Sequence, residues 1–485
     1  MRLRALLLIS PLVLAACTFP RVPTPDTHTP AAFEAPTDVT QPGVSMERWW
    51  AAYDDPQLTA LVDEALQSAP DARSARARLD EANAIRSEAL DAYNPQGALQ
   101  GSATETTTKT LGTAPSIAFP LPGGGVQTIP LTNNGSVNQE AANFDVSWEI
   151  DLFGRRAAAR RKANADLAAA RFDYEATRTS LAANVADQLF QARGLAIQLE
   201  DAKEADRIQR ELARVARVKA DHGLGAAADA DQAASELAQT EAEVSDLGAQ
   251  LHAARRTLLV LVGRGVDPLA SLPAAPQAGA PPAVPATVPG ELLARRPDVR
   301  EASANLRSAT GQLKLNELAL FPKFTLLPGV GITSTPEFGT NIVSDAWSIG
   351  VGVAQPILDL PRLKSEIRVQ GARADEAVIA YEKAVQTAYG ESENALVELS
   401  SDEKRVKLLT DGEAEARRAY DAARLRYGAG IDDLTSVLTA ERTWRTARTA
   451  LTGAQVQALR RSVQTFKALG GGWDPSAPAG ERASR

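Results

Sequence analysis

Side chains that commonly carry out chemistry are scarce in this sequence of 485 residues. It has one cysteine, Cys17, and three histidines, His28, His222 and His252. A single cysteine cannot form an intramolecular disulfide, and the histidines are too few and too scattered to predict a metal centre. The sequence therefore predicts no metal, no other cofactor and no catalytic residue, and it indicates a protein that is not an enzyme.

Charge and hydropathy exclude two further classes of protein. The 52 lysine and arginine residues are outnumbered by 60 aspartate and glutamate residues, which gives a formal net charge of −8. This balance argues against a nucleic-acid partner, because such partners favour basic surfaces. The sequence has no run of about 18 apolar residues, so we expect no transmembrane helix.

The first 16 residues are typical of a secretory signal peptide. Arg2 and Arg4 precede an apolar stretch, residues 5–16, which is too short to span a bilayer permanently. The segment Leu14-Ala-Ala-Cys17 resembles a bacterial lipobox, in which the cysteine becomes the lipid-modified first residue of the mature chain. An ordinary signal peptide followed by a chance cysteine is the alternative.

The residues after the cysteine bear on location and anchoring. Thr18, and not an aspartate, follows Cys17, which by analogy with bacterial lipoprotein sorting favours the outer membrane over the inner one. One acyl chain binds a membrane only weakly, so a durable anchor needs more than one chain on the cysteine. Residues 17–45 are rich in Pro and Thr, and we expect them to form an extended, lipidated tether.

The rest of the chain is an internal duplication. At an offset of 227 residues Pro70-Asp71 aligns with Pro297-Asp298, and at an offset of 207 residues Gly223 aligns with Gly430. The change of offset places 20 extra residues in the first copy, before residue 150, in a segment whose Gly and Pro content is typical of loops. We expect a first repeat over residues 46–263, an Ala- and Pro-rich connection over 264–290, a second repeat over 291–473 and a flexible tail over 474–485.

Each repeat is predicted to contain one very long helix and two shorter ones. Residues 154–221 lack proline and repeat apolar side chains at spacings of three and four, and residues 362–428 repeat them in the same way. A helix of this length extends about 100 Å. The shorter helices are expected over 71–94, 226–262, 298–320 and from Gly430 to about Leu469. Their summed lengths nearly equal the long helix, which favours end-to-end stacking along it over independent coiled coils.

Between the helices, each repeat offers one predicted β-hairpin. Apolar and polar residues alternate over 144–152 and 347–353, and the expected partner strands are 99–106 and 324–333. The alternation suits a membrane β-barrel and a half-buried soluble sheet equally well, and the predicted outer-membrane location favours the barrel. Four strands cannot close a barrel, because the smallest barrels have about eight, whereas three chains would supply twelve.

Four motifs carry a resemblance to a known family. They are Trp49-Trp50, Ser147–Arg155, Leu292–Arg300 and Phe466–Trp473. Together they resemble the outer membrane factor family, relatives of TolC, and within it the NodT-type lipoproteins of RND efflux systems, over about residues 45–473. The resemblance implies a mainly α-helical fold with membrane β-structure. Long α-helical hairpins would form a periplasmic helical barrel, and four strands per chain would contribute to a shared 12-stranded β-barrel in a homotrimer.

The resemblance also implies a function. The trimer would be the exit duct of a tripartite RND-type efflux pump, passively conducting small molecules across the periplasm and the outer membrane of a Gram-negative bacterium. Its partners would be a periplasmic adaptor of the membrane fusion protein type, an inner-membrane RND pump, and outer-membrane lipid through acylated Cys17. A channel of type I protein secretion is an alternative, and a periplasmic coiled-coil adaptor without a pore is a more distant one.

The resemblance places the functional end of the duct at its periplasmic tip, where the helix pairs turn, at about residues 217–232 and 424–442. Members of the family close this tip through polar contacts, and the adaptor opens it. Asp229 matches a common Asp position, whereas Thr439 stands where many members have Asp, so a ring of Thr439 would be neutral. The candidates for the gate or the adaptor contact are Arg217, Lys219, Asp229, Asp231, Arg424, Arg426, Tyr427, Asp432, Asp433 and Thr439. For each of them, a solvated turn residue is the alternative interpretation.

Overall fold

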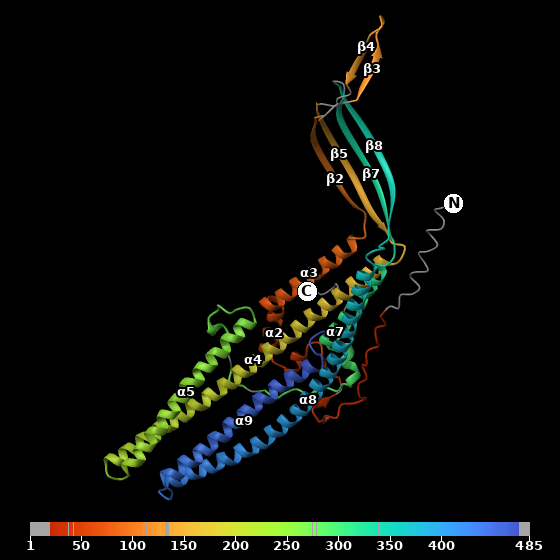
Figure 1. Cartoon of the computed structure of the whole chain (residues 1–485). Coiled ribbons are helices and arrows are strands. Elements are labelled where there is room, and N and C mark those ends of the chain that lie inside the picture. Colours follow the sequence, from red (N-terminus) through yellow and green to blue (C-terminus); the bar gives the residue numbers. More distant parts are fainter. Residues whose placement is uncertain are drawn as a thin grey trace. The chain divides into compact units, whose positions relative to one another are not determined.

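A computed structural model describes residues 20–36, 38–41, 43–109, 111, 115–130, 135–273, 275–277, 279–337 and 340–474. The chain divides into two compact units (Figure 1). The strand unit contains residues 84–164 and 308–374 with the N-terminal residues to Val22, and the helical unit contains residues 23–83, 165–307 and those from 375 onward. Cys17, the predicted signal peptide and the tail beyond residue 474 lie outside the described residues, and the predicted repeat boundaries stay a prediction.

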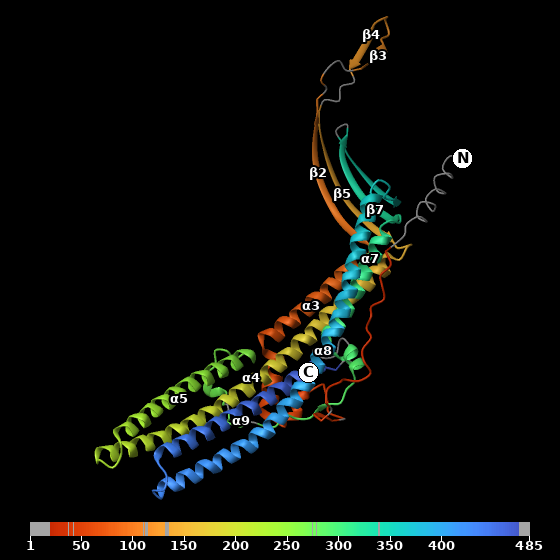
Figure 2. The same ribbon diagram turned by 60° about the horizontal axis from the view of Figure 1, so that its bottom comes forward.

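The strand unit contains a four-stranded antiparallel sheet in the order β2-β5-β7-β8. Its strands are β2 (Gln96–Thr108), β5 (Gly135–Ile150), β7 (Lys323–Glu337) and β8 (Thr340–Ala354). Each repeat supplies two of the four strands, as the sequence predicts, and β5 of the first repeat pairs with β7 of the second. Figure 2 shows that these long strands curve together.

One row of residues crosses all four strands and is apolar throughout. This apolar row consists of Leu99 on β2, Phe144 on β5, Val330 on β7 and Trp347 on β8, each opposite the next. All of these side chains are exposed, with exposed fractions of 77% for Leu99 and 79% for Trp347. The adjacent row is polar or small and consists of Gln100, Asn143, Gly331 and Ala346. Since successive side chains in a strand point to opposite faces, the two faces of the sheet differ in polarity.

The extra segment of the first repeat forms a second, smaller ladder in place of the loop that its composition predicts. β3 (Ser116–Pro120) pairs antiparallel with β4 (Val126–Pro130). Gly123 and Gly124, with φ of 129° and 92°, turn the chain between them in conformations that favour glycine. The glycine-rich composition therefore marks only the turn, while its flanks alternate as strands do.

The helices repeat with nearly equal lengths in the two halves of the chain. The long helices α4 (Arg155–Asp221) and α8 (Leu360–Gly428) have 67 and 69 residues. The shorter ones are α3 (Pro70–Asp91) and α7 (Pro297–Leu318), of 22 residues each, and α5 (Ala227–Leu261) and α9 (Leu434–Ala468), of 35 residues each. A further helix, α2 (Pro56–Ser68), precedes α3. Of the helices that the structure describes, none is both long and apolar enough to cross a membrane.

Two equivalent glycines show that the shorter helices stack end to end. Gly263 follows α5, and a Cβ placed there would lie 3.3 Å from the Cα of Ala69, which precedes α3. Gly470 follows α9, and a Cβ placed there would lie 2.9 Å from the carbonyl carbon of Arg295, just before α7. Both glycines have positive φ, of 86° and 81°. The helix ends therefore abut in both repeats, as the summed lengths predict.

The main core of the helical unit surrounds Trp49 and Phe466. Both side chains are fully buried, and their rings stack with centroids 5.6 Å apart. The backbone N–H of Gly472 donates to the carbonyl of Met46 at 2.7 Å, beside the same rings. Two of the motifs that carry the family resemblance, far apart in sequence, thus pack against one another.

The described part of the predicted tether is extended and lies against the helical unit. Phe33 stacks on Tyr389 of α8, with ring centroids 5.9 Å apart. Farther along, β1 (Thr40–Gln41) pairs in parallel with β6 (Val284–Pro285), which lies in the connection between the repeats. The segment is therefore fastened to the rest of the protein at two places.

Candidate functional site

The two helical hairpins of the helical unit, α4–α5 and α8–α9, end in turns of nearly the same conformation (Figure 1). Gly223 has φ of 71° in the first turn and Gly430 has φ of 72° in the second. In each turn the residue after the glycine donates its N–H back into the long helix, Leu224 to Lys219 at 2.8 Å and Ile431 to Arg426 at 2.9 Å. A left-handed glycine with such a bond is a common C-terminal helix cap. The duplication thus produces two equivalent turns.

One contact joins the two turns directly. Lys219, in the last turn of α4, donates to the hydroxyl of Tyr427 on α8 at 2.9 Å. Its ammonium also lies 4.7 Å from the centre of the tyrosine ring, within the range of a cation–π interaction. The structure thus brings together two of the predicted tip residues from different repeats, in a contact that solvent reaches.

Around the second turn, two predicted aspartates are engaged locally. Asp432 pairs with Arg426 at 2.9 Å. Asp433 caps α9, because its carboxylate accepts hydrogen bonds from the N–H and the hydroxyl of Ser436 at 2.8 and 2.7 Å. These hydrogen bonds hold the pKa of Asp433 below its usual value. Asp433 therefore shapes the start of α9.

The remaining predicted tip residues are not brought together within one chain. Arg217 pairs with Asp221 of its own helix at 3.5 Å. The hydroxyl of Thr439 donates to the carbonyl of Thr435, also within its own helix, at 2.8 Å. Three exposed side chains form no ion pair with any other described residue: Asp229, Asp231 and Arg424. These three are accessible to another chain.

A row of arginines on α9, which sequence reasoning missed, also joins the two hairpins. Arg442 pairs with Glu236 of α5 at 2.7 Å, and Arg448 pairs with Asp201 of α4 at 2.6 Å. Arg445 lies between them, and we call these three arginines the arginine seam. Their spacing of three residues places them on one helix face and is visible in the sequence. Their partners are more than 200 residues away, so no local pattern identifies them.

Glu441 is a buried acid beside the arginine seam. Its exposed fraction is 1%, and it accepts a hydrogen bond from Gln209 of α4 at 3.2 Å. Its other oxygen lies 3.4 Å from Nε of Arg445. Burial raises the pKa of Glu441, although Arg445 acts in the opposite direction.

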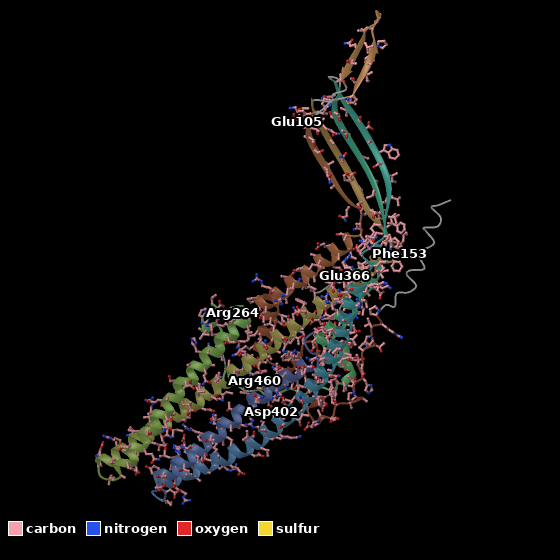
Figure 3. The ribbon with its side chains drawn as sticks, viewed as in Figure 1. Glu105, Phe153, Arg264, Glu366, Asp402 and Arg460 are labelled. Carbon is pink, nitrogen blue, oxygen red and sulfur yellow. The ribbon has the colours of Figure 1, made fainter. Side chains whose placement is uncertain are left out.

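Nearer the core, the hairpins are joined by a two-fold contact. Arg460 of α9, labelled in Figure 3, donates to both carboxylate oxygens of Asp187 on α4, at 2.8 and 3.1 Å. It also donates to the side chain of Gln191 at 3.2 Å. Bidentate arginine–carboxylate pairs are among the stronger polar contacts in proteins.

The curved sheet with an exposed apolar row, the duplicated helical hairpins and their polar turns define a membrane channel protein of the outer-membrane class. The sequence profile of the family described as "Outer membrane efflux protein" matches residues 61–264 and 288–471. The chain belongs to this family.

Relatives extend over nearly the whole chain. The pyoverdine export outer membrane protein OpmQ of Pseudomonas putida is 28% identical over 476 residues, which cover 96% of this chain and 97% of that protein. The toluene efflux pump outer membrane protein TtgC of the same species is 25% identical and covers 99% of this chain and 97% of its own length.

Solved structures agree with this relationship. The outer-membrane channel OprN has a TM-score of 0.77 at 29% identity, and the alignment covers 93% of this chain and 99% of OprN. The CmeC outer membrane channel of Campylobacter jejuni has a TM-score of 0.83 at 23% identity, with 95% and 96% covered, and supports the fold alone. These comparisons confirm the predicted family, the fold class, the efflux transport function and the location in the outer membrane of a Gram-negative bacterium. The relatives carry the names of channels and transport proteins.

Proposed function

We propose that three copies of this chain form the exit duct of a tripartite RND-type efflux pump, which conducts small molecules passively. The apolar row is the observation that carries this proposal. In the described sheet, β2 and β8 each have one neighbour, so both outer edges are free to pair with another copy. An apolar sheet in lipid must close on itself, because unpaired edges leave backbone groups without hydrogen bonds. Three copies supply twelve strands, above the roughly eight of the smallest barrels.

The Lys219–Tyr427 contact is proposed to hold the tip closed, since it links the two turns and is accessible. The ion pair of Arg426 with Asp432 assists by fixing the second turn. An adaptor of the membrane fusion protein type, linked to an inner-membrane RND pump, opens the tip by competing for these groups.

The partner-free tip residues are proposed to face a neighbouring copy or the adaptor. These are Asp229, Asp231 and Arg424. Arg217 and Asp433, which bond within their own hairpins, support the shape of the turns. A ring of Thr439 is neutral, so closure rests on the Lys219 and Arg426 contacts and not on an acidic ring at that level.

Acylated Cys17 is proposed to anchor each copy in the outer membrane. The stacking of Phe33 on Tyr389 supports this role, because it fixes the chain that follows the anchor to the helical unit. The cargo is proposed to be small molecules, since OpmQ and TtgC are named for pyoverdine and toluene. Those names favour efflux over the alternative of type I protein secretion.

Two experiments test the proposed duct. Native mass spectrometry of the detergent-solubilised full-length protein should show an assembly of three chains, and a monomer would contradict the shared barrel. Deletion of the gene should increase susceptibility across a panel of dyes, solvents and antibiotics and leave protein secretion unchanged. Loss of a secreted protein with unchanged susceptibility would favour the secretion alternative.

A further inference from the structure

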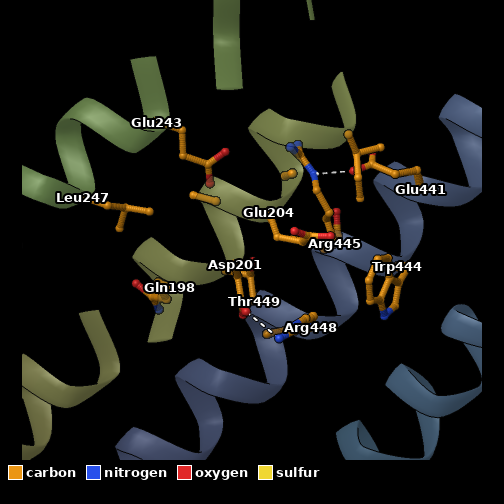
Figure 4. Close-up of a pocket in the computed structure, with 15 residues that line it drawn as sticks. Gln198, Asp201, Glu204, Glu243, Leu247, Glu441, Trp444, Arg445, Arg448 and Thr449 are labelled. Carbon is orange, nitrogen blue, oxygen red and sulfur yellow. Dashed lines mark ion pairs between the residues drawn. The ribbon is translucent and has the colours of Figure 1, made fainter. Parts of the chain in front are cut away.

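A cavity of about 470 Å³ lies between α4, α5 and α9 in the helical unit (Figure 4). This volume is within the range of small-molecule sites in proteins, which is about 300–1,000 Å³. Part of its lining is apolar and consists of Ala202, Ala205, Ile208, Leu247 and Ala450. The proposed gate residues at the turns are not among its lining residues, so the cavity is a separate feature of the hairpins.

Acidic groups outnumber basic groups in the lining of this cavity. Its carboxylates are Asp201, Glu204, Glu243 and Glu441, and its guanidinium groups are Arg445 and Arg448. Arg448 is paired with Asp201, and Arg445 lies beside Glu441. With every group ionised, the lining therefore carries two negative charges in excess, which favours a cation.

Two carboxylate oxygens at the cavity have no hydrogen-bond donor among the described residues. They are Oε1 of Glu441 and Oδ2 of Asp201. Oε1 of Glu441 is the stronger case, because that side chain is 1% exposed and water has almost no access to it. Burial raises the pKa of both acids, as expected for carboxylates with too few donors. Leaving a buried acceptor unpaired is costly, so a bound donor would be stabilised here.

The aromatic ring at the cavity favours a hydrogen-bonding cation over a quaternary one. Quaternary ammonium groups bind on open aromatic faces. Trp444 does not offer one, since its ring stacks on Tyr420 with centroids 5.2 Å apart and has the guanidinium of Arg448 at 5.7 Å from its centre. An ammonium with N–H groups matches the free carboxylate oxygens instead.

We propose that this cavity binds a small organic cation whose ammonium group donates a hydrogen bond to Oε1 of Glu441 and whose apolar part lies against Ile208 and Leu247. Oδ2 of Asp201 is available to a second donor. Since Glu441 lies on α9, Asp201 on α4 and Leu247 on α5, the bound cation links the two hairpins. The site therefore couples occupancy by an amine to the strength of the contact between α4 and α9.

A matched set of four six-carbon compounds tests the proposal: hexylammonium, hexyltrimethylammonium, hexanol and hexanoate. Isothermal titration calorimetry is carried out on the full-length protein in a nonionic detergent. Hexylammonium should bind saturably and raise the thermal unfolding midpoint as its concentration increases. Hexyltrimethylammonium, which lacks N–H groups, should bind about tenfold more weakly, and hexanol and hexanoate should not bind. Equal heats for all four compounds would overturn the proposal, because partition into apolar surface would explain them.

Variants locate the site. Glu441→Gln keeps the side-chain size and an acceptor for Gln209 but removes the charge, and it should weaken hexylammonium binding about tenfold, or ~1.4 kcal/mol. Glu204→Gln is the control, because Glu204 lines the same cavity but is exposed and already bonded to Arg207 at 2.5 and 2.9 Å. It should change the affinity little. Equal affinity of wild type and Glu441→Gln would contradict the proposal.

A second variant guards against misfolding of the first. Leu247→Trp on α5 fills the cavity and leaves every charged group in place, so it should abolish hexylammonium binding. Circular dichroism confirms that each variant keeps its helical content. Hexylammonium binding that survives in folded Leu247→Trp would place the amine outside this cavity.

Discussion

Arg460 and Asp187 join α9 to α4 through two hydrogen bonds, of 2.8 and 3.1 Å, in a partly buried position. The link between Lys219 and Tyr427 at the turns has one hydrogen bond and is exposed. Exposed polar contacts are screened by water and salt and contribute less than enclosed ones. We therefore expect the two hairpins to separate at their turns before they separate near the core.

The contact at the turns should control how often the channel opens. An exposed cation–π and hydrogen-bonded contact contributes about 1 kcal/mol, so Lys219→Met should make openings roughly fivefold more frequent per chain. Tyr427→Phe, which keeps the ring, should have a smaller effect. Single-channel recording in planar bilayers measures both. Lys203→Met is the control, because Lys203 pairs with Glu200 inside α4 at 3.0 Å, and an equal effect there would refute the assignment.

Loss of the Arg460 contact should destabilise the helical unit. Arg460→Met leaves the carboxylate of Asp187 partly buried without its partner, and we expect a loss of about 1–2 kcal/mol in the free energy of unfolding. Guanidinium denaturation followed by circular dichroism measures it. Arg418→Met removes an exposed pair with Glu415 at 3.7 Å and should change stability by less than about 0.5 kcal/mol. Similar losses in the two variants would contradict this ranking of contacts.

Two glycines with the same backbone conformation should respond differently to a methyl group. Gly430→Ala adds a Cβ at φ of 72° with no atom within 4 Å, so only backbone strain of about 1–2 kcal/mol is expected. Gly470→Ala adds the same strain at φ of 81° and places its Cβ 2.9 Å from the carbonyl carbon of Arg295. Gly470→Ala should therefore lower the thermal midpoint clearly more. Equal midpoints would show that the α9–α7 junction is loosely packed.

Asp55 should make the protein sensitive to acid. Burial alone would raise the pKa of Asp55, but hydrogen bonds from Arg193 and from the N–H groups of Leu58 and Gln57 at the start of α2 lower it overall. Its contribution to stability is therefore present above the unfolded value of 3.8 and is lost as the pH falls through the lower folded value. Asp55→Asn should destabilise the protein at pH 7.

The measurement for Asp55 is thermal unfolding between pH 7 and pH 2. The difference between wild type and Asp55→Asn should narrow below about pH 4. Asp54→Asn, next to it and without an ion pair in the described part of the chain, should leave the acid midpoint unchanged. A constant difference across the whole pH range would contradict the role given to the carboxylate.

Glu441 should behave in the opposite way. Burial and the nearby Glu236 raise its pKa, and Arg445 and Gln209 only partly offset them. The native state thus binds the proton more tightly than the unfolded state, so stability is highest below the unfolded value of 4.5 and falls as the pH rises through the folded value. Glu441→Gln should raise the unfolding midpoint at pH 8 and leave it unchanged at pH 4. A lower midpoint at pH 8 would mean that the charge of Glu441 stabilises the fold.

The parts of the fold that depend on local patterns could be predicted from the sequence. The long first helix was expected over 154–221 and spans Arg155–Asp221, because an unbroken 3.6-residue period and the absence of proline define it. The four strands were found by their alternation, although they extend beyond the expected ends. The β3–β4 ladder was missed because glycine and proline dominate the composition of a segment in which only the turn needs them.

The site was harder to predict, because its partners come from distant parts of the chain. Lys219 and Tyr427 were both named as tip residues, yet nothing in the sequence pairs them across 208 positions. The arginine seam was missed for the same reason. Asp433 was a gate candidate, whereas its position three residues before Ser436 is typical of a helix cap and carries a local signal that was readable.

The apolar row has a consequence for biogenesis. A single folded chain presents Leu99, Trp347 and two unpaired sheet edges to its surroundings, and such surfaces bind indiscriminately to other strands and chains. A newly secreted copy therefore cannot wait safely as a finished monomer on its way to the membrane. Its sheet must either stay unformed or be shielded by a chaperone until other copies arrive. Assembly is then the last step of folding, and the yield of intact protein should depend on how fast copies meet at the membrane.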